Sequence, residues 1–278
     1  MSNIVGFDKQ KKYFKALLDG GALSHAYLFH GPEMAGKRSF VLELCGKVNG
    51  RCFSANDPDI KFISAPDAEI PISAIRELKS FFSLRPYYGP YKFAVIDDAE
   101  KLNTESSNAL LKVLEEPPKF GIIFLITSKP QMLLPTILSR CEAVRCLPQG
   151  DTEILEYLGD RRINGEDRAL LVELAGGRLG WVVRTLENGN LPEIKKTIEE
   201  FRKVARQGIP EKMEYAKKLS ENENRQEIFI DLLNWLYAQH KKGKSAPHAL
   251  RGLLKLQNIL SKSEFNPRLA IENFLLHI

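Results

Sequence analysis

The chain has 278 residues, of which 44% are hydrophobic and 27% are charged, and its formal net charge is +5. This length and composition suit a globular protein of two or three domains, and they exclude a low-complexity or fibrous chain. No apolar run reaches the roughly 18 residues that span a bilayer, and the N-terminus lacks the regions of a signal peptide. Four irregularly spaced cysteines make no disulfide framework, so we expect a cytoplasmic protein without membrane contact. The charge permits contact with nucleic acid but does not require it.

The first 148 residues alternate predicted strands and helices, which is typical of an α/β doubly wound domain with a parallel sheet. Short apolar runs predict buried strands over residues 26–29, 60–63, 93–96, 121–127 and 144–147. Helical apolar spacing occurs over residues 8–19, 37–48, 72–83 and 103–114, and a short helix is predicted over 135–141. We therefore expect one domain over residues 1–148.

A phosphate-binding loop is predicted between the first strand and the second helix. Gly31 and Gly36 bracket the loop and Lys37 follows it, in the order strand, Gly-x-x-x-x-Gly-Lys and helix. Glycines let backbone N–H groups converge on phosphate oxygens at a helix N-terminus, whereas a plain tight turn is the alternative. A working loop next has a Ser or Thr hydroxyl that holds magnesium, but this chain has Arg38, and Ser39 comes about 100° further around the helix. The loop is thus suited to phosphate and poorly built for the metal.

Two carboxylates directly follow the strand at 93–96. Asp97 is placed to contact magnesium through water. Asp98 stands where active ATPases with such a loop commonly have a Glu, which polarises the water that attacks the phosphate. An Asp is one methylene shorter, and small changes in geometry have large effects on rate. Either residue could instead cap the following turn, and this alternative weighs more for Asp98. At the end of a later strand, Thr127 or Ser128 could sense a γ-phosphate.

The chain is predicted to be helical from residue 151 onward. Helices are expected over 151–158, 166–175 and 178–187, and apolar stripes over 193–278 are broad enough for packing in a bundle. Asn188 to Pro192 is predicted to be a linker. The predicted domains are therefore a core of residues 1–148, a small helical domain of 149–190 and an all-α domain of 191–278.

Three segments together resemble a known family. They are Asp97-Asp-Ala-Glu-Lys-Leu102, Asn108-Ala-Leu-Leu-Lys-Val-Leu-Glu-Glu-Pro-Pro118 and Leu134-Pro-Thr-Ile-Leu-Ser-Arg-Cys141. With residues 24–29 ahead of the loop and 266–272 near the C-terminus, they are similar to the AAA+ clamp-loader subunits of bacterial DNA polymerase III along the whole chain. The resemblance implies an AAA+ P-loop core, a helical lid domain and a collar domain that holds a five-membered ring of subunits.

The chain departs from the ATP-hydrolysing motor subunits of that family at three positions. Arg38 replaces the metal-binding Thr, and Asp98 stands at the position of the catalytic Glu. Alignment on Ala175-Gly176-Gly177 puts Gly180 at the position of a sensor arginine, although Arg178 and Arg184 lie nearby. With these departures, the chain resembles the members of the family that do not hydrolyse ATP themselves.

Arg140 is retained, and the resemblance implies that it acts in trans as an arginine finger on a neighbour's ATP. An ordinary surface salt bridge is the alternative, and it leaves the Ser and Cys on either side unexplained. The predicted site residues are therefore the finger Arg140 and a vestigial nucleotide site made of Gly31, Gly36, Lys37 and Asp97.

We expect that the chain requires no cofactor. We expect no independent ATPase activity, although the degenerate loop could still bind ATP or ADP. Many relatives carry a four-cysteine zinc module after the P-loop helix, where this chain has only Cys45 and Cys52. Two thiolates cannot close a tetrahedral zinc site, so no zinc is expected, and buried inert thiols are predicted.

The implied function is to help load the sliding clamp onto primed DNA during replication, as a component of the DNA polymerase III holoenzyme. The implied partners are homologous motor and delta subunits in the ring, the sliding clamp, and primed DNA through the complex. The main alternative is an ATP-binding and hydrolysing motor subunit, and nucleotide binding without hydrolysis lies between the two. A stand-alone helicase-loader-like protein is disfavoured by the collar-like helices and the segment 266–272.

Overall fold

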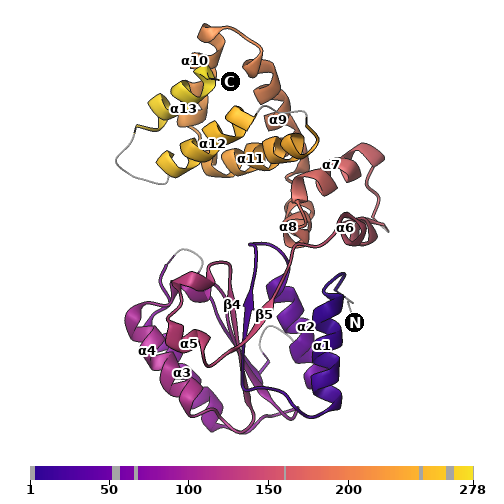
Figure 1. The fold of residues 1–278 in the computed structure, drawn as a ribbon, viewed down its shortest axis with the longest axis vertical. Helices are drawn as coiled ribbons and strands as arrows, with labels where there is room; N and C mark the ends of the chain where they lie inside the picture. Colours follow the sequence, from indigo (N-terminus) through magenta and orange to yellow (C-terminus); the bar gives the residue numbers. More distant parts are fainter. Residues whose placement is uncertain are drawn as a thin grey trace. The chain divides into compact units, whose positions relative to one another are not determined.

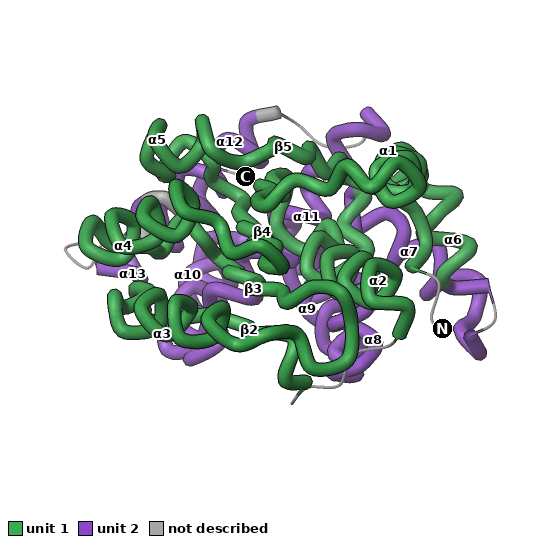
Figure 2. The backbone as a smooth tube through the Cα atoms, turned by 90° about the horizontal axis from the view of Figure 1, so that it is seen from below, with its two compact units in different colours: residues 1–157, 177–180 green, residues 158–176, 181–278 purple. Residues whose placement is uncertain are grey.

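The computed structural model describes residues 4–51, 57–65, 68–159, 161–243, 247–260 and 266–277. The chain divides into two compact units, shown in green and purple in Figure 2. Unit 1 comprises Met1–Tyr157 with Gly177–Gly180, and unit 2 comprises Leu158–Gly176 with Trp181–Ile278. The predicted division into three domains stays a prediction.

Unit 1 is built on a five-stranded sheet with the order β2-β3-β4-β1-β5, in which every paired strand is parallel. The strands are β1 (Ala26–His30), β2 (Ile60–Ile63), β3 (Lys92–Ile96), β4 (Gly121–Thr127) and β5 (Glu142–Arg145). The predicted parallel sheet is therefore confirmed. Strand β5 was predicted two residues too late, because it is an edge strand in which only Val144 is buried, so its apolar signal is weak.

Helices cover both faces of the sheet (Figure 1). The helices that precede and connect the strands are α1 (Asp8–Asp19), α2 (Lys37–Val48), α3 (Ile72–Ser83), α4 (Thr104–Glu115) and α5 (Pro135–Leu138). Side chains alternate along each strand: Tyr27 and Phe29 pack against α1 and α2, whereas Leu28 belongs to the core under α3 and α4. Asn103 caps α4, since its side chain accepts a hydrogen bond from the backbone N–H of Ser106. The sheet is thus buried on both sides.

The rest of the chain is helical, in agreement with the predicted helical C-terminal part. After α6 (Asp151–Leu158), the helices are α7 (Gly165–Ala175), α8 (Leu179–Asn188), α9 (Leu191–Ala205), α10 (Ile209–Ser220), α11 (Arg225–Lys241), α12 (Pro247–Leu260) and α13 (Pro267–Leu276). The predicted linker over 188–192 is wrong except at Gly189 and Asn190, because α9 accepts Pro192 in its first turn, where no backbone N–H is needed. Within the described residues, no helix is long and apolar enough to cross a membrane.

Candidate functional site

The glycine loop joins β1 to α2 and has the backbone conformation that its glycines permit. Gly31 and Gly36 have φ values of +153° and +96°. A Cβ at Gly31 would lie 2.0 Å from the carbonyl oxygen of Cys146, the residue after β5, so only glycine fits at position 31. Helix α2 begins at Lys37, which places its first turn at the end of the loop. This is the strand–loop–helix geometry of a phosphate site.

Lys37 is buried and bound to its own loop. Its Nζ atom donates hydrogen bonds to the carbonyl oxygens of Gly31, at 2.8 Å, and Pro32, at 2.6 Å. Burial lowers the pKa of the ammonium group, and the charges of surrounding acidic groups oppose this shift. The lysine therefore has internal partners at the place where a phosphate would be bound.

The position next to Lys37 does not suit a magnesium ion. The guanidinium group of Arg38 lies 4.1 Å from the ring centroid of Phe62 on β2, which is a cation–π contact. Its positive charge also acts on Asp97, whose pKa is raised chiefly by burial and by the charge of Asp98. Ser39 is exposed, as expected from its place around the helix. The loop thus lacks the metal-binding hydroxyl and carries a fixed cation instead.

Asp98 is paired with a lysine of the turn that follows it. It has a left-handed backbone with φ of 52°, and its Oδ2 atom lies 3.4 Å from Nζ of Lys101. It precedes the 3₁₀ turn η1 (Ala99–Lys101) without forming a side-chain cap, so the capping alternative is wrong for Asp98. Asp97 accepts a hydrogen bond at 3.1 Å from the N–H of Asp98.

Glu100 is a residue of this site that the sequence interpretation missed. The hydroxyl of Thr127 donates to Oε2 of Glu100 at 2.6 Å, and the hydroxyl of Ser128 lies 2.9 Å from its Oε1. Burial alone would raise the pKa of the Glu100 carboxyl, but these hydrogen bonds outweigh it and lower the pKa. The only signal in the sequence is its position three residues after Asp97, which places it beside the end of the neighbouring strand.

Gly180 lies directly against the loop. Its N–H donates a 2.7 Å hydrogen bond to the carbonyl oxygen of Met34, and a Cβ at position 180 would lie 2.6 Å from that oxygen. No side chain fits there, so the position aligned with the sensor arginine cannot carry one. Arg184 instead lies 3.7 Å from Glu227 on α11.

Arg140 follows α5 and forms an ion pair within the chain. Its Nη2 atom lies 2.9 Å from Oε1 of Glu115, and its Nη1 atom donates to the carbonyl oxygen of Thr136 at 3.0 Å. The side chains of Arg140 and Glu115 are 36% and 51% exposed. Cys141 packs on the core beneath α4, which holds the segment in place and leaves the arginine at the surface. The structure thus shows the surface salt bridge that was the alternative for Arg140, in a form that solvent and a neighbouring chain can reach.

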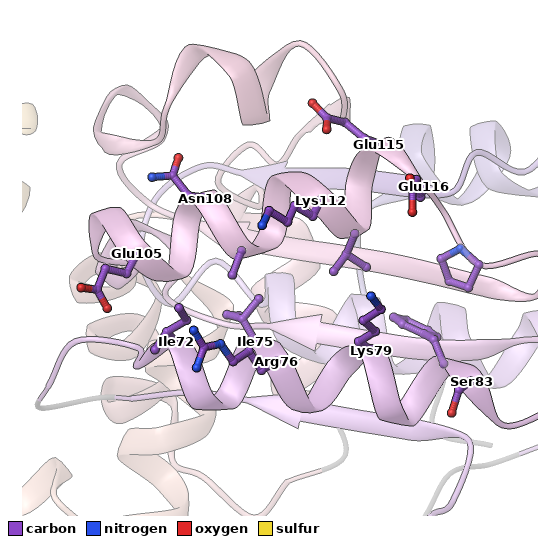
Figure 3. A pocket seen from close by; sticks show the side chains of 14 residues that line it. Ile72, Ile75, Arg76, Lys79, Ser83, Glu105, Asn108, Lys112, Glu115 and Glu116 are labelled. Atoms are coloured by element: carbon purple, nitrogen blue, oxygen red, sulfur yellow. The ribbon is translucent and has the colours of Figure 1, made fainter.

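A groove of about 830 Å³ lies between α3 and α4. Figure 3 shows Lys79 of α3 and Lys112 of α4 pointing into the groove, whereas Glu115 points away from α3. None of its lining residues belongs to the glycine loop. The groove is therefore separate from the nucleotide-type site.

Burial raises the pKa of the thiol in each cysteine that the structure describes. Burial raises the pKa of Cys141 and Cys146 to about 12, and that of Cys45 well above its ordinary value. Cys52 lies outside the described residues. Among the described residues, no cluster of three His, Cys, Asp or Glu side chains is arranged to hold a metal ion.

The sequence matches a family described as DNA polymerase III, delta subunit, over residues 6–149. It is 31% identical over 206 residues to DNA polymerase III subunit delta' of Pseudomonas aeruginosa, covering 67% of this chain and 63% of that protein. It is 31% identical over 167 residues to subunit delta' of Bacillus subtilis, covering 55% and 51%. It is 32% identical over 156 residues to subunit gamma/tau of Mycobacterium tuberculosis, covering 50% and 27%. The chain thus spans about half to two thirds of the delta' relatives.

A solved structure extends the likeness in fold to nearly the whole chain. The crystal structure of a DNA polymerase III gamma-subunit-related protein from Thermotoga maritima covers 95% of this chain and 97% of its own, with a TM-score of 0.54 and 19% identity. At this identity the match shows a shared fold.

Proposed function

This chain belongs to the family of DNA polymerase III delta-prime subunits, and we propose on that premise that it works in a clamp loader without hydrolysing ATP itself. It helps to load the sliding clamp onto primed DNA, and its chemical contribution is Arg140. That side chain completes the ATP site of the neighbouring motor subunit by stabilising charge that develops on the phosphates.

The observation that carries the proposal is a contrast between the residues around the glycine loop, which are bound to one another, and Arg140, which lies at the surface. Lys37 is bound by its own loop, and the hydroxyls of Thr127 and Ser128 are bound to Glu100. Within the described residues, the partners of Arg140 lie at the surface, and an exposed ion pair contributes about 0–1 kcal/mol, so little free energy is needed to release it. A phosphate on a neighbouring chain would offer a stronger, bidentate partner.

We further propose that the helical parts have the roles of lid and collar. Residues 149–190 form the lid, and residues 191–278 form the collar that joins motor and delta subunits in a five-membered ring. The amphipathic helices from α9 to α13 support this assignment, because they carry buried apolar faces as well as exposed leucines such as Leu254 and Leu269.

An ATP-hydrolysing motor subunit is the second candidate. It is favoured by the preserved geometry of Gly31, Gly36 and Lys37, with Asp97 directly after the end of β3. This candidate requires magnesium to bind beside Arg38, and magnesium-dependent phosphate release by the purified chain would support it.

The test of the proposed function is Arg140→Ala in the reconstituted complex. Turnover at the adjoining motor site is expected to fall by about 10³–10⁵-fold, as for arginine fingers in related hydrolases. Single-turnover phosphate release measures this loss, and gel filtration checks that the complex still assembles.

Two further variants sharpen that test. Arg140→Lys keeps the charge but not the forked donor geometry, so it is expected to rescue only part of the rate. Arg145→Ala removes another exposed arginine of unit 1 and is expected to leave turnover unchanged. Full turnover by an assembled Arg140→Ala complex would contradict the proposed function.

A further inference from the structure

Glu100 occupies the hydroxyl groups that a nucleotide would need at the end of β4. Thr127 is fully buried, and its hydroxyl is fully used: it donates to Glu100 and accepts a hydrogen bond at 3.0 Å from the N–H of Lys129. The Ser128 hydroxyl lies 2.9 Å from Glu100 and 3.3 Å from Oε1 of Glu33 in the glycine loop. Two carboxylates thus bind the donors that would meet a terminal phosphate.

The backbone that carries Glu100 is fixed. Nζ of Lys101 donates a 3.1 Å hydrogen bond to the carbonyl oxygen of Ala65, and Leu102 forms a parallel bridge to Ile70. Ala99 is fully buried under the same turn. Because the turn is anchored on both sides of Glu100, its carboxylate cannot move away with the main chain.

The charges at the site disfavour an incoming polyphosphate. Glu33, Asp97 and Glu100 are carboxylates whose negative charges act on Lys37, the cation that would meet a phosphate. An incoming polyphosphate would therefore compete with carboxylates that already stand around this lysine. A nucleoside triphosphate adds several more negative charges, and no magnesium ligand follows Lys37 to help neutralise them.

We propose that Glu100 is a built-in anion that takes the place of a terminal phosphate and excludes nucleoside triphosphates from this site. The chain is thereby held in one state, whether or not ATP is present around it. This inference rests on the proposed function, in which the chain does not use ATP.

The experiment is a titration of a fluorescent ATP analogue into the purified full-length chain, with and without magnesium. The wild type is expected to bind weakly. Glu100→Gln removes the charge and Glu100→Ala also frees both hydroxyls, so both are expected to bind at least tenfold more tightly. Glu116→Gln removes an exposed carboxylate at the end of α4 and is expected to bind like the wild type.

A gain of binding cannot come from mere loss of structure, and thermal melting checks that each variant is folded. If Glu100→Ala does not fold, the isosteric Glu100→Gln decides. Affinities of both folded variants equal to that of the wild type would overturn the inference about Glu100. Phosphate release by the wild-type chain would contradict the proposed function instead, so the two failures are distinguishable.

Discussion

Glu115 and Arg140 belong to two different motifs and lie 25 residues apart in the chain, and the structure joins them in one ion pair. The sequence was sufficient to single out both motifs, but it could not show that one side chain binds the other. The same limit applies to Glu100, because its partners Thr127 and Ser128 come from the neighbouring strand. Pairs of this kind depend on strand order and on side-chain direction, and the spacing of residues along the sequence does not reveal either.

We infer that Glu115 holds Arg140 at rest until a neighbour's phosphate competes for it.

The variant Glu115→Gln tests this inference. It removes the charge that Arg140 must leave, so turnover at the neighbouring motor site in the reconstituted complex is expected to rise by no more than about fivefold, the equivalent of about 1 kcal/mol. The melting temperature of the isolated chain should change little, because both side chains are exposed. A tenfold fall in turnover would contradict the inference and would mean that Glu115 orients Arg140 for catalysis.

At the scale of elements, most of unit 1 could be predicted. Helix α1, strand β2, helix α3 and strand β4 have the predicted bounds, because each has a strong apolar period and a clear stop signal. The weaker elements were misplaced: β5 has little buried surface, and α9 begins at residues that resemble a turn. The contact of Gly180 with the glycine loop lay beyond prediction, because it joins residues that are about 150 positions apart in the chain.

Gly180→Ala is expected to destabilise the protein. The added Cβ would lie 2.6 Å from the carbonyl oxygen of Met34, and overpacking of this kind costs about 1–3 kcal/mol. Gly165→Ala is the matched control, because Gly165 begins α7 and its Cβ would meet nothing within 4 Å. That change should be neutral or slightly stabilising. Equal melting temperatures for the two variants would show that Gly180 does not pack against the loop.

At the scale of the whole molecule, composition and pattern predicted an α/β part followed by helices, and the structure confirms both. The assembly is harder to read from sequence, because an apolar stripe looks the same whether it faces its own core or another subunit. Leu254 and Leu269 remain exposed on α12 and α13, so part of that pattern does not serve the chain's own core. In the proposed function, this chain acts within a complex, to which it contributes an arginine and a scaffold.

The most direct test of that account compares Lys37→Ala with Arg140→Ala in the reconstituted clamp loader, by following phosphate release in the presence of primed DNA and clamp. We predict that Lys37→Ala leaves turnover near the wild-type level, because the proposed function gives the chain's own loop no part in ATP hydrolysis, whereas Arg140→Ala abolishes turnover at the neighbouring site. Loss of turnover with Lys37→Ala and full turnover with Arg140→Ala would contradict the account and would identify this chain as a motor subunit.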